Sequence, residues 1–237
     1  MSIAEKLTQI AENEQKVYEA GKKAEWSDFW DEFQENGNRT EYMNNALGGY
    51  SFSTKNFYPK YDIKVADGYR VMYAWSNPER HTMNLAERLR ECGVRIILDN
   101  ATRITGFFGY GCFTEVPEMD FTKVSGATDS VYTQCKYLVT IGKITCNENT
   151  AFSSCFTTNE SLVNITFEGV IGKNIDFRSS PLSKTSQENI ITHLSTTASG
   201  MTLTLGKTAV TNAFGSTTAD EWTALIATKS NWTITLA

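Results

Sequence analysis

The pattern of apolar and polar positions between residues 104 and 205 repeats. Three segments align, 108–119, 131–144 and 152–167, and each contains a large apolar residue, a cysteine and two further apolar positions spaced three apart. The equivalent positions are Cys112, Cys135 and Cys155, then Phe113, Leu138 and Leu162, then Val116, Ile141 and Ile165. Such positions recur at an interval of roughly 24 residues, and a period of this length is typical of a solenoid.

One such unit cannot fold alone, because roughly 24 residues bury too little apolar surface to offset the entropy of ordering them. Successive units must stack and share one core. We therefore expect each equivalent apolar position to form a ladder along the solenoid. Cys112, Cys135 and Cys155 would form one such ladder as small buried hydrophobic residues.

Each repeat is predicted to contribute one short strand, at 116–121, 139–146 and 163–167, with a degenerate further rung at 171–177. A helix is predicted over 183–194, with Ser186 as its N-cap. The alternation of Met201–Leu205 and Trp232–Leu236 predicts two strands that each place threonine on one face. Because threonine recurs at every second position, that face should be polar and wet. A last helix should begin near 218–221.

The first 36 residues have a helical pattern. Ser2 and Glu5 form a capping box, and apolar residues recur at alternating spacings of three and four, at Ile3, Leu7, Ile10 and Val17. Two interpretations fit this imperfect seam. It is either a coiled-coil stalk that joins two or three copies, or an amphipathic helix that docks on the body of its own chain. An aromatic stripe from Trp26 to Phe33 continues it, as core or as a docking face.

Residues 37–103 are rich in aromatic side chains and are predicted to cap the solenoid. A hairpin is expected from strands at 61–65 and 69–74, followed by a helix at 82–92 that ends at Gly93 and a strand at 94–98. The predicted fold class is therefore an α+β repeat solenoid in three parts: an N-terminal helix (1–36), an aromatic and helical cap (37–103) and a repeat domain with a C-terminal cap (104–237).

The repeat resembles the irregular leucine-rich repeats of the BspA-like class, in which an aromatic residue, a cysteine, a leucine and an isoleucine follow one another. The segments 1–13, 29–40, 180–184, 205–210, 212–215 and 231–236 further resemble phage and prophage proteins from gut Firmicutes. The resemblance implies binding rather than chemistry, as a tail or virion-associated module. It places the protein in the virion, or in the host cytoplasm before assembly.

Composition and charge reduce the number of function classes that the chain could belong to. The formal charge is −5, from 22 basic and 27 acidic residues, and a nucleic-acid binder needs a net basic face. No run of 18 apolar residues occurs, so membrane insertion is not expected. Charged residues at the start, such as Glu5 and Lys6, interrupt the apolar region that a Sec signal requires.

The search for catalytic chemistry finds no cofactor motif and no metal-ligand spacing. His81 and His193 are far apart in sequence and have no neighbouring ligand pair. The odd number of cysteines, five, favours free thiols over a disulfide framework. Glu115, Glu118 and Asp120 form an acidic cluster. It either binds Ca²⁺ or is a solvated edge, and the spacing of a dedicated calcium loop is missing.

Hypotheses from different classes remain. The first is a non-enzymatic module that recognises a cell-surface protein or glycan without a cofactor, with Tyr110, Tyr132 and Tyr137 as candidate binding residues. The second is a cell-envelope depolymerase, which would need paired carboxylates such as Glu115 with Asp120 or Asp176. A third is an intracellular adaptor of the bacterial host that uses the same surface.

The stalk interpretation makes a testable prediction. Deleting residues 1–35 should leave a soluble folded body and lower the solution mass from a dimer or trimer to a monomer, because the apolar seam is then removed. Light scattering on both proteins measures this. An unchanged mass would remove the stalk interpretation.

Overall fold

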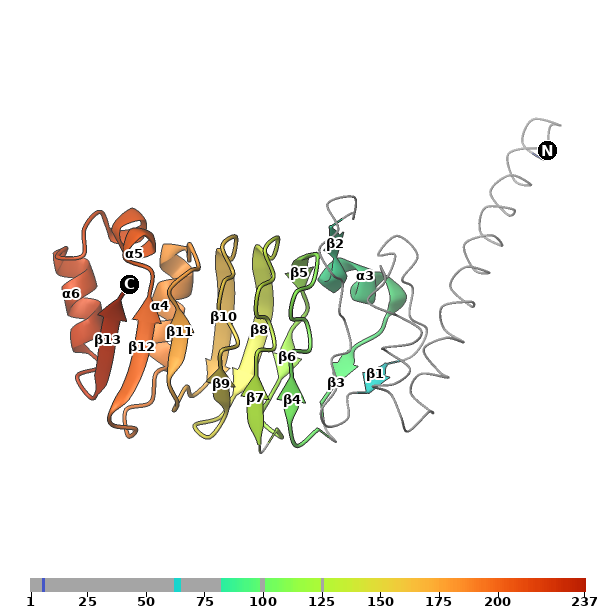
Figure 1. Cartoon of the computed structure of the whole chain (residues 1–237), viewed down its shortest axis with the longest axis horizontal. Helices are drawn as coiled ribbons and strands as arrows, with labels where there is room; N and C mark the ends of the chain where they lie inside the picture. Colours follow the sequence, from blue (N-terminus) through green and yellow to red (C-terminus); the bar gives the residue numbers. More distant parts are fainter. Residues whose placement is uncertain (1–5, 7–61, 65–81, 99–100, 125) are drawn as a thin grey trace.

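The computed structural model describes residue 6, residues 62–64, 82–98, 101–124 and 126–237. This part of the chain is a parallel β-solenoid of about 4 turns with few helices. The turns stack along the long axis of the molecule, and the chain ends beside the last strand, β13 (Figure 1). The expected repeat solenoid is confirmed at this level. The N-terminal seam residues Ile3, Leu7, Ile10 and Val17 lie outside the described residues.

The middle turns carry two strands each, where the sequence predicted one. On one side β4 (Ile104–Thr105), β7 (Ala127–Asp129) and β9 (Ala151–Ser153) form a three-stranded parallel sheet. On the other side β2 (Met83–Asn84), β5 (Phe113–Val116), β8 (Thr140–Cys146) and β10 (Asn164–Gly169) form a second parallel sheet. The strand predicted at 116–121 is broken at Pro117, and its second half, β6 (Met119–Asp120), pairs with β8. The first sheet was missed because its strands are only 2 or 3 residues long.

The later turns replace the second strand with helices. β11 (Ile175–Phe177), β12 (Met201–Leu205) and β13 (Trp232–Leu236) form a parallel sheet, and the predictions for β12 and β13 are confirmed. The helices are α4 (Lys184–His193), α5 (Lys207–Phe214), which was not predicted, and α6 (Asp220–Ala227).

The repeat becomes longer where a turn contains a helix. Thr133 and Thr157, on neighbouring turns built from strands, are bonded at a sequence separation of 24. Thr204 and Thr235, on neighbouring turns that contain helices, are bonded at a separation of 31. Helices need this longer repeat because they rise only about 1.5 Å per residue.

At the other end, the chain leaves the second sheet after β2 and forms α3 (Leu85–Cys92). Asn84 caps the helix by accepting a hydrogen bond from the Glu87 backbone, and Gly93 ends it with a φ of 67°. β3 (Ile96–Ile97) then pairs in parallel with β1 (Ile63–Lys64). A strand is therefore present where the first strand of the expected hairpin was predicted, and the hairpin itself stays a prediction. The second, at 69–74, lies outside the described residues, as does most of the predicted cap.

The core is built from ladders, as the repeat predicts. Val116 is paired with Ile141, and Ile165 follows the paired residues Asn164 and Thr140. Phe113, Leu138 and Leu162 are all 0% exposed. An aromatic ladder runs beside them: the Tyr132 ring stacks on Phe108 at 5.4 Å and on Phe156 at 5.5 Å between centroids. These ring contacts between equivalent positions stabilise the packing of successive turns.

The expected cysteine ladder is wrong at its last rung. Cys112, Cys135 and Cys155 are buried, but the Tyr132 backbone donates to the Cys155 carbonyl and the Tyr132 ring stacks on Phe156, so Cys155 lies one rung above Val131. The rung above Cys135 is Asn159, whose Oδ1 accepts a hydrogen bond from the Cys135 backbone N–H at 3.0 Å. The alignment by cysteine identity therefore misplaced this one rung of the third repeat by four positions, whereas Leu162 and Ile165 were aligned correctly. A constant spacing of three, from Phe156 through Asn159 to Leu162, carries the correct alignment.

Two backbone positions in each turn adopt the left-handed conformation at the repeat interval. Tyr110, Gln134 and Thr158 have φ of 63°, 55° and 59°, and Ser130 and Ser154 have φ of 55° and 51°. Such values are uncommon for residues other than glycine. Their recurrence at the same place in successive turns means that stacking imposes the conformation, since no shared side-chain chemistry does.

Helix α4 covers the open edge of β10. Its N-cap is Ser183 and not Ser186, as the sequence had suggested. Ser186 instead accepts from the Ile165 backbone N–H at 3.0 Å and donates to the Val163 carbonyl at 3.1 Å. One turn later Asn189 accepts from the Phe167 N–H at 2.7 Å and donates to its carbonyl at 3.4 Å. Side chains of the helix thus replace the backbone of a neighbouring strand, which is one way to protect a sheet edge.

This contact predicts that Asn189→Ala destabilises the protein by about 1–3 kcal/mol, because it leaves the partly buried N–H and C=O of Phe167 unpaired. Denaturant unfolding of the full chain measures the change. Thr185→Ala, on an exposed position of the same helix, is the matched control and should stay within about 0.5 kcal/mol of the parent protein. Equal stability of the two variants would show that the side-chain bonds contribute nothing.

Candidate binding surface

The solenoid presents two polar sheet faces. We call the outward side chains of β11, β12 and β13 the threonine face, and those of β5, β6, β8 and β10 the acidic face. On the threonine face, Asp176, Thr204 and Thr235 lie in one row, because their backbones are paired in register. On the acidic face one row runs from Glu115 through Thr140 to Asn164, and another from Asp120 through Thr145 to Glu168.

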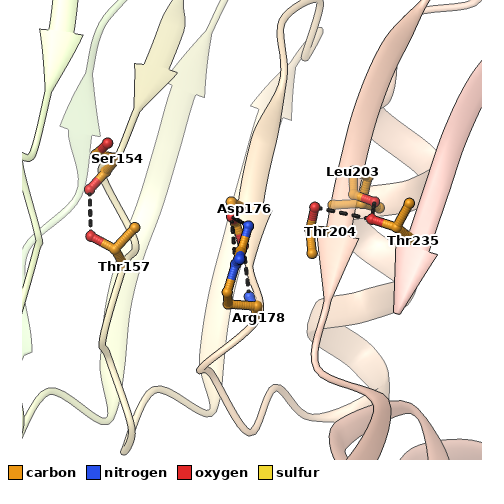
Figure 2. Close-up of polar contacts among 7 residues, drawn as sticks. All are labelled: Ser154, Thr157, Asp176, Arg178, Leu203, Thr204 and Thr235. Carbon is orange, nitrogen blue, oxygen red and sulfur yellow. Dashed lines mark hydrogen bonds and ion pairs between the residues drawn. The ribbon is translucent and has the colours of Figure 1, made fainter. Parts of the chain in front are cut away.

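The side chains of the threonine face are mostly bonded to one another. Arg178 holds the Asp176 carboxylate with two nitrogens, at 2.8 and 2.6 Å, and the Thr235 hydroxyl donates to Thr204 at 3.1 Å (Figure 2). The polar face expected from the alternating threonines is confirmed, since Thr233 and Thr235 are exposed. A ligand here would compete with bonds that are already made.

The charged side chains of the acidic face are less completely paired with one another. Lys143 lies near its centre and contacts Glu168 at 2.7 Å, and this contact raises the pKa of the lysine and lowers the pKa of the glutamate. Both side chains are largely in solvent, so the pair contributes little to stability. Glu118 and Asp120 also act on Lys143 at longer range and raise its pKa further. The face therefore carries more carboxylates than this lysine neutralises.

A groove of about 700 Å³ lies where the acidic face meets α3 and β3. One wall is formed by Glu115, Glu118 and Asp120, and the opposite wall carries Arg90 and Arg95. The remaining lining residues are mainly apolar or small: Ala86, Leu89, Val94, Ile96, Val116, Pro117, Met119, Gly142, Lys143 and Thr145. A volume of this size falls within the range of pockets that enclose small ligands or short segments.

The groove has a structural cause in the kink between β5 and β6. Pro117 cannot donate a backbone hydrogen bond, so the ladder is interrupted there. The kink carries the backbone close to Gly142 of β8, where a Cβ would lie 2.6 Å from the Glu118 nitrogen. Only glycine fits without displacing the Pro117–Glu118 backbone. On the other side, the chain leaves the sheet after Asn84 and continues as α3, which leaves the space open.

The three tyrosines expected to bind a ligand are not gathered in one place. Tyr132 is 0% exposed and lies between Phe108 and Phe156, so a ligand cannot reach it and that expectation is wrong. Tyr110 is half-buried, and its hydroxyl accepts from Gln134 at 3.3 Å. Tyr137 is 47% exposed in the turn before β8. Ligand contacts by Tyr110 and Tyr137 stay predictions.

The carboxylates suggested for catalysis are divided between the two faces. Glu115 and Asp120 both line the groove, whereas Asp176 is on the threonine face and is bound to Arg178. Glu115 accepts from the Asn84 amide at 2.8 Å, and Asp120 accepts from the Thr122 backbone and hydroxyl at 2.8 and 2.6 Å. Within the described residues, no group of three or more His, Cys, Asp or Glu side chains is placed to hold a metal ion.

The cysteines are free thiols, as their odd number suggested. Burial raises the pKa of Cys135, Cys146 and Cys155 to about 12 each, so these residues stay protonated at neutral pH. A thiol that does not ionise is a poor nucleophile. His193 Nδ1 donates to the Asn189 carbonyl oxygen, 2.8 Å away on its own helix. His81 lies outside the described residues.

Comparisons with known proteins identify no relative: no family model, no curated protein and no solved structure matches this chain. Among the helices that the structure describes, none has the length and apolar character needed to cross a membrane.

The burial of Tyr132 predicts that Tyr132→Phe stabilises the protein. Its hydroxyl has no hydrogen-bond partner among the described residues, and the rungs above and below are phenylalanine. Removing a buried unpaired hydroxyl should raise the free energy of unfolding by about 1 kcal/mol. Thermal unfolding measures this. Tyr110→Phe, which loses a bonded hydroxyl, is the control and should not stabilise; a destabilised Tyr132→Phe would mean that the hydroxyl has a partner.

Proposed function

We propose that this chain is a non-catalytic binding module built on leucine-rich repeats, and that its acidic face recognises a protein or glycan on a cell surface. The observation that carries the proposal is the groove at the end of the acidic face. It is concave and combines apolar and charged lining residues, and no lysine or arginine of the described chain forms an ion pair with its acidic wall. Concave sites with a few convergent polar groups are where proteins bind ligands.

Binding without catalysis is favoured by the way the carboxylates are used. Glu115 and Asp120 accept hydrogen bonds from Asn84 and Thr122, which hold them in structural roles. A depolymerase would need one carboxyl group with a raised pKa beside an ionised one. The buried thiols are equally poor candidates for a nucleophile.

The cellular setting rests on the resemblance to BspA-like proteins of phages and prophages. We propose a virion-associated or tail module, with the N-terminal helix joining two or three copies. Repeated copies would raise the apparent affinity of a weak surface by avidity. An adaptor in the bacterial cytoplasm would use the same face but would not bind intact cells.

The test compares two threonine-to-arginine variants in the full chain. Thr166 is exposed on β10, the last strand of the acidic face, where it pairs with Lys143, and Thr233 is exposed on the threonine face on β13. Binding of the fluorescently labelled protein to intact gut Firmicutes and to their isolated walls is measured by flow cytometry and pull-down. We expect Thr166→Arg to weaken binding by about tenfold or more, which corresponds to about 1.4 kcal/mol, and Thr233→Arg to leave it unchanged.

The two variants carry the same substitution, so they control for net charge and for the loss of a strand threonine. Loss of binding with Thr233→Arg alone would move the site to the threonine face. Absence of binding to every cell and wall preparation would overturn the surface-recognition proposal and favour the adaptor.

A further inference from the structure

We propose that the groove between α3 and the acidic face binds a peptide segment that carries lysine or arginine. This inference rests on the proposed binding function and names the chemistry of the partner. It derives from carboxylates that form no ion pair in the described part of the fold and from the shape of the space beside them.

The basic residues around the groove are already engaged or turned outward. Lys143 is paired with Glu168 at 2.7 Å, and Arg95 is paired with Asp62 at 3.0 Å. Arg90 is 79% exposed and lies 3.7 Å from Glu87 of its own helix. None of these three cations forms an ion pair with the acidic wall.

Two of the three carboxylates of the acidic wall accept hydrogen bonds from uncharged groups. Glu115 is held by the Asn84 amide and Asp120 by Thr122. Among the described residues, no lysine or arginine forms an ion pair with Glu115, Glu118 or Asp120. Three carboxylates at one wall of a concave space focus a negative potential there, and this favours a cationic partner.

The shape favours a peptide over other cations. Ile96, Pro117 and Ala86 are partly exposed beside the carboxylates, so the methylene stem of a lysine or arginine has apolar surface to lie on. No aromatic side chain is among the described lining residues, which removes a stacking platform for a sugar ring or a base.

The experiment selects peptides without bias. The full-length protein is labelled and incubated with a bead library of random hexapeptides, and bound beads are sequenced. We expect enrichment of lysine and arginine over aspartate and glutamate. The affinity of an enriched peptide, measured by fluorescence anisotropy, should fall as ionic strength rises from about 0.05 M to about 0.5 M, because exposed charges are then screened.

Two matched charge reversals locate the contact. Glu118→Lys changes a groove carboxylate that has no hydrogen bond within the described structure, and we expect it to abolish the enrichment and to weaken the peptide by about tenfold. Glu160→Lys makes the same change at an exposed turn residue outside the groove, and should preserve both. Circular dichroism of both variants checks that they fold alike.

Every other outcome overturns the inference. Three results would each show that the groove does not select positively charged peptides. These are enrichment of acidic or purely apolar peptides, no enrichment at all, and enrichment that survives Glu118→Lys. These results leave the proposed function standing if the parent protein still binds cells and Thr166→Arg does not. Loss of cell binding without loss of lysine selection would overturn the proposed function alone.

Discussion

Backbone hydrogen bonding between successive turns, at an offset that is constant within the turns built from strands, is the interaction on which this molecule depends. The N–H groups of Gly106, Phe108 and Tyr110 donate to the carbonyls of residues 129, 131 and 133, and those of Ser130, Tyr132 and Gln134 donate to residues 153, 155 and 157. Because each turn repeats the same offset, equivalent side chains are stacked one above another. The aromatic ladder, the buried Asn159 contact and the recurring left-handed residues all follow from this register.

The two ends of the regular region show what happens when the register stops. After β10 the second strand is replaced by α4, and Ser186 and Asn189 supply the hydrogen bonds that a strand backbone would have made. Before β5 the chain turns into α3 and makes no such replacement beside β6 in the described part of the structure. One irregularity is therefore closed by side chains, while the other leaves a groove. In solenoids the repeated core residues provide the stability, so residues at irregular positions can vary and determine which ligand is bound.

The sequence by itself determined the solenoid, the core ladder of Val116, Ile141 and Ile165, and the strands β12 and β13, because a repeated or alternating apolar pattern is a direct record of which side chains face the core. It did not determine the second strand of each turn. β4, β7 and β9 are too short to leave a pattern, and only stacking against neighbouring turns makes them strands. The cysteine of the third repeat was also assigned to the wrong rung, because asparagine, and not cysteine, occupies the position equivalent to Cys135 there.

The groove was decided by tertiary structure alone. Its acidic residues could be noticed in the sequence, but the net charge of −5 does not say which carboxylates are neutralised. That depends on where Lys143, Arg90 and Arg95 lie, and these come from β8, α3 and the segment before β3, which meet only when the turns stack. Likewise Tyr132 has the chemistry of a binding residue but the position of a core residue, since the ladder places its ring between two phenylalanines. Local pattern specifies which residues are buried, whereas contacts between turns specify which charges remain unpaired.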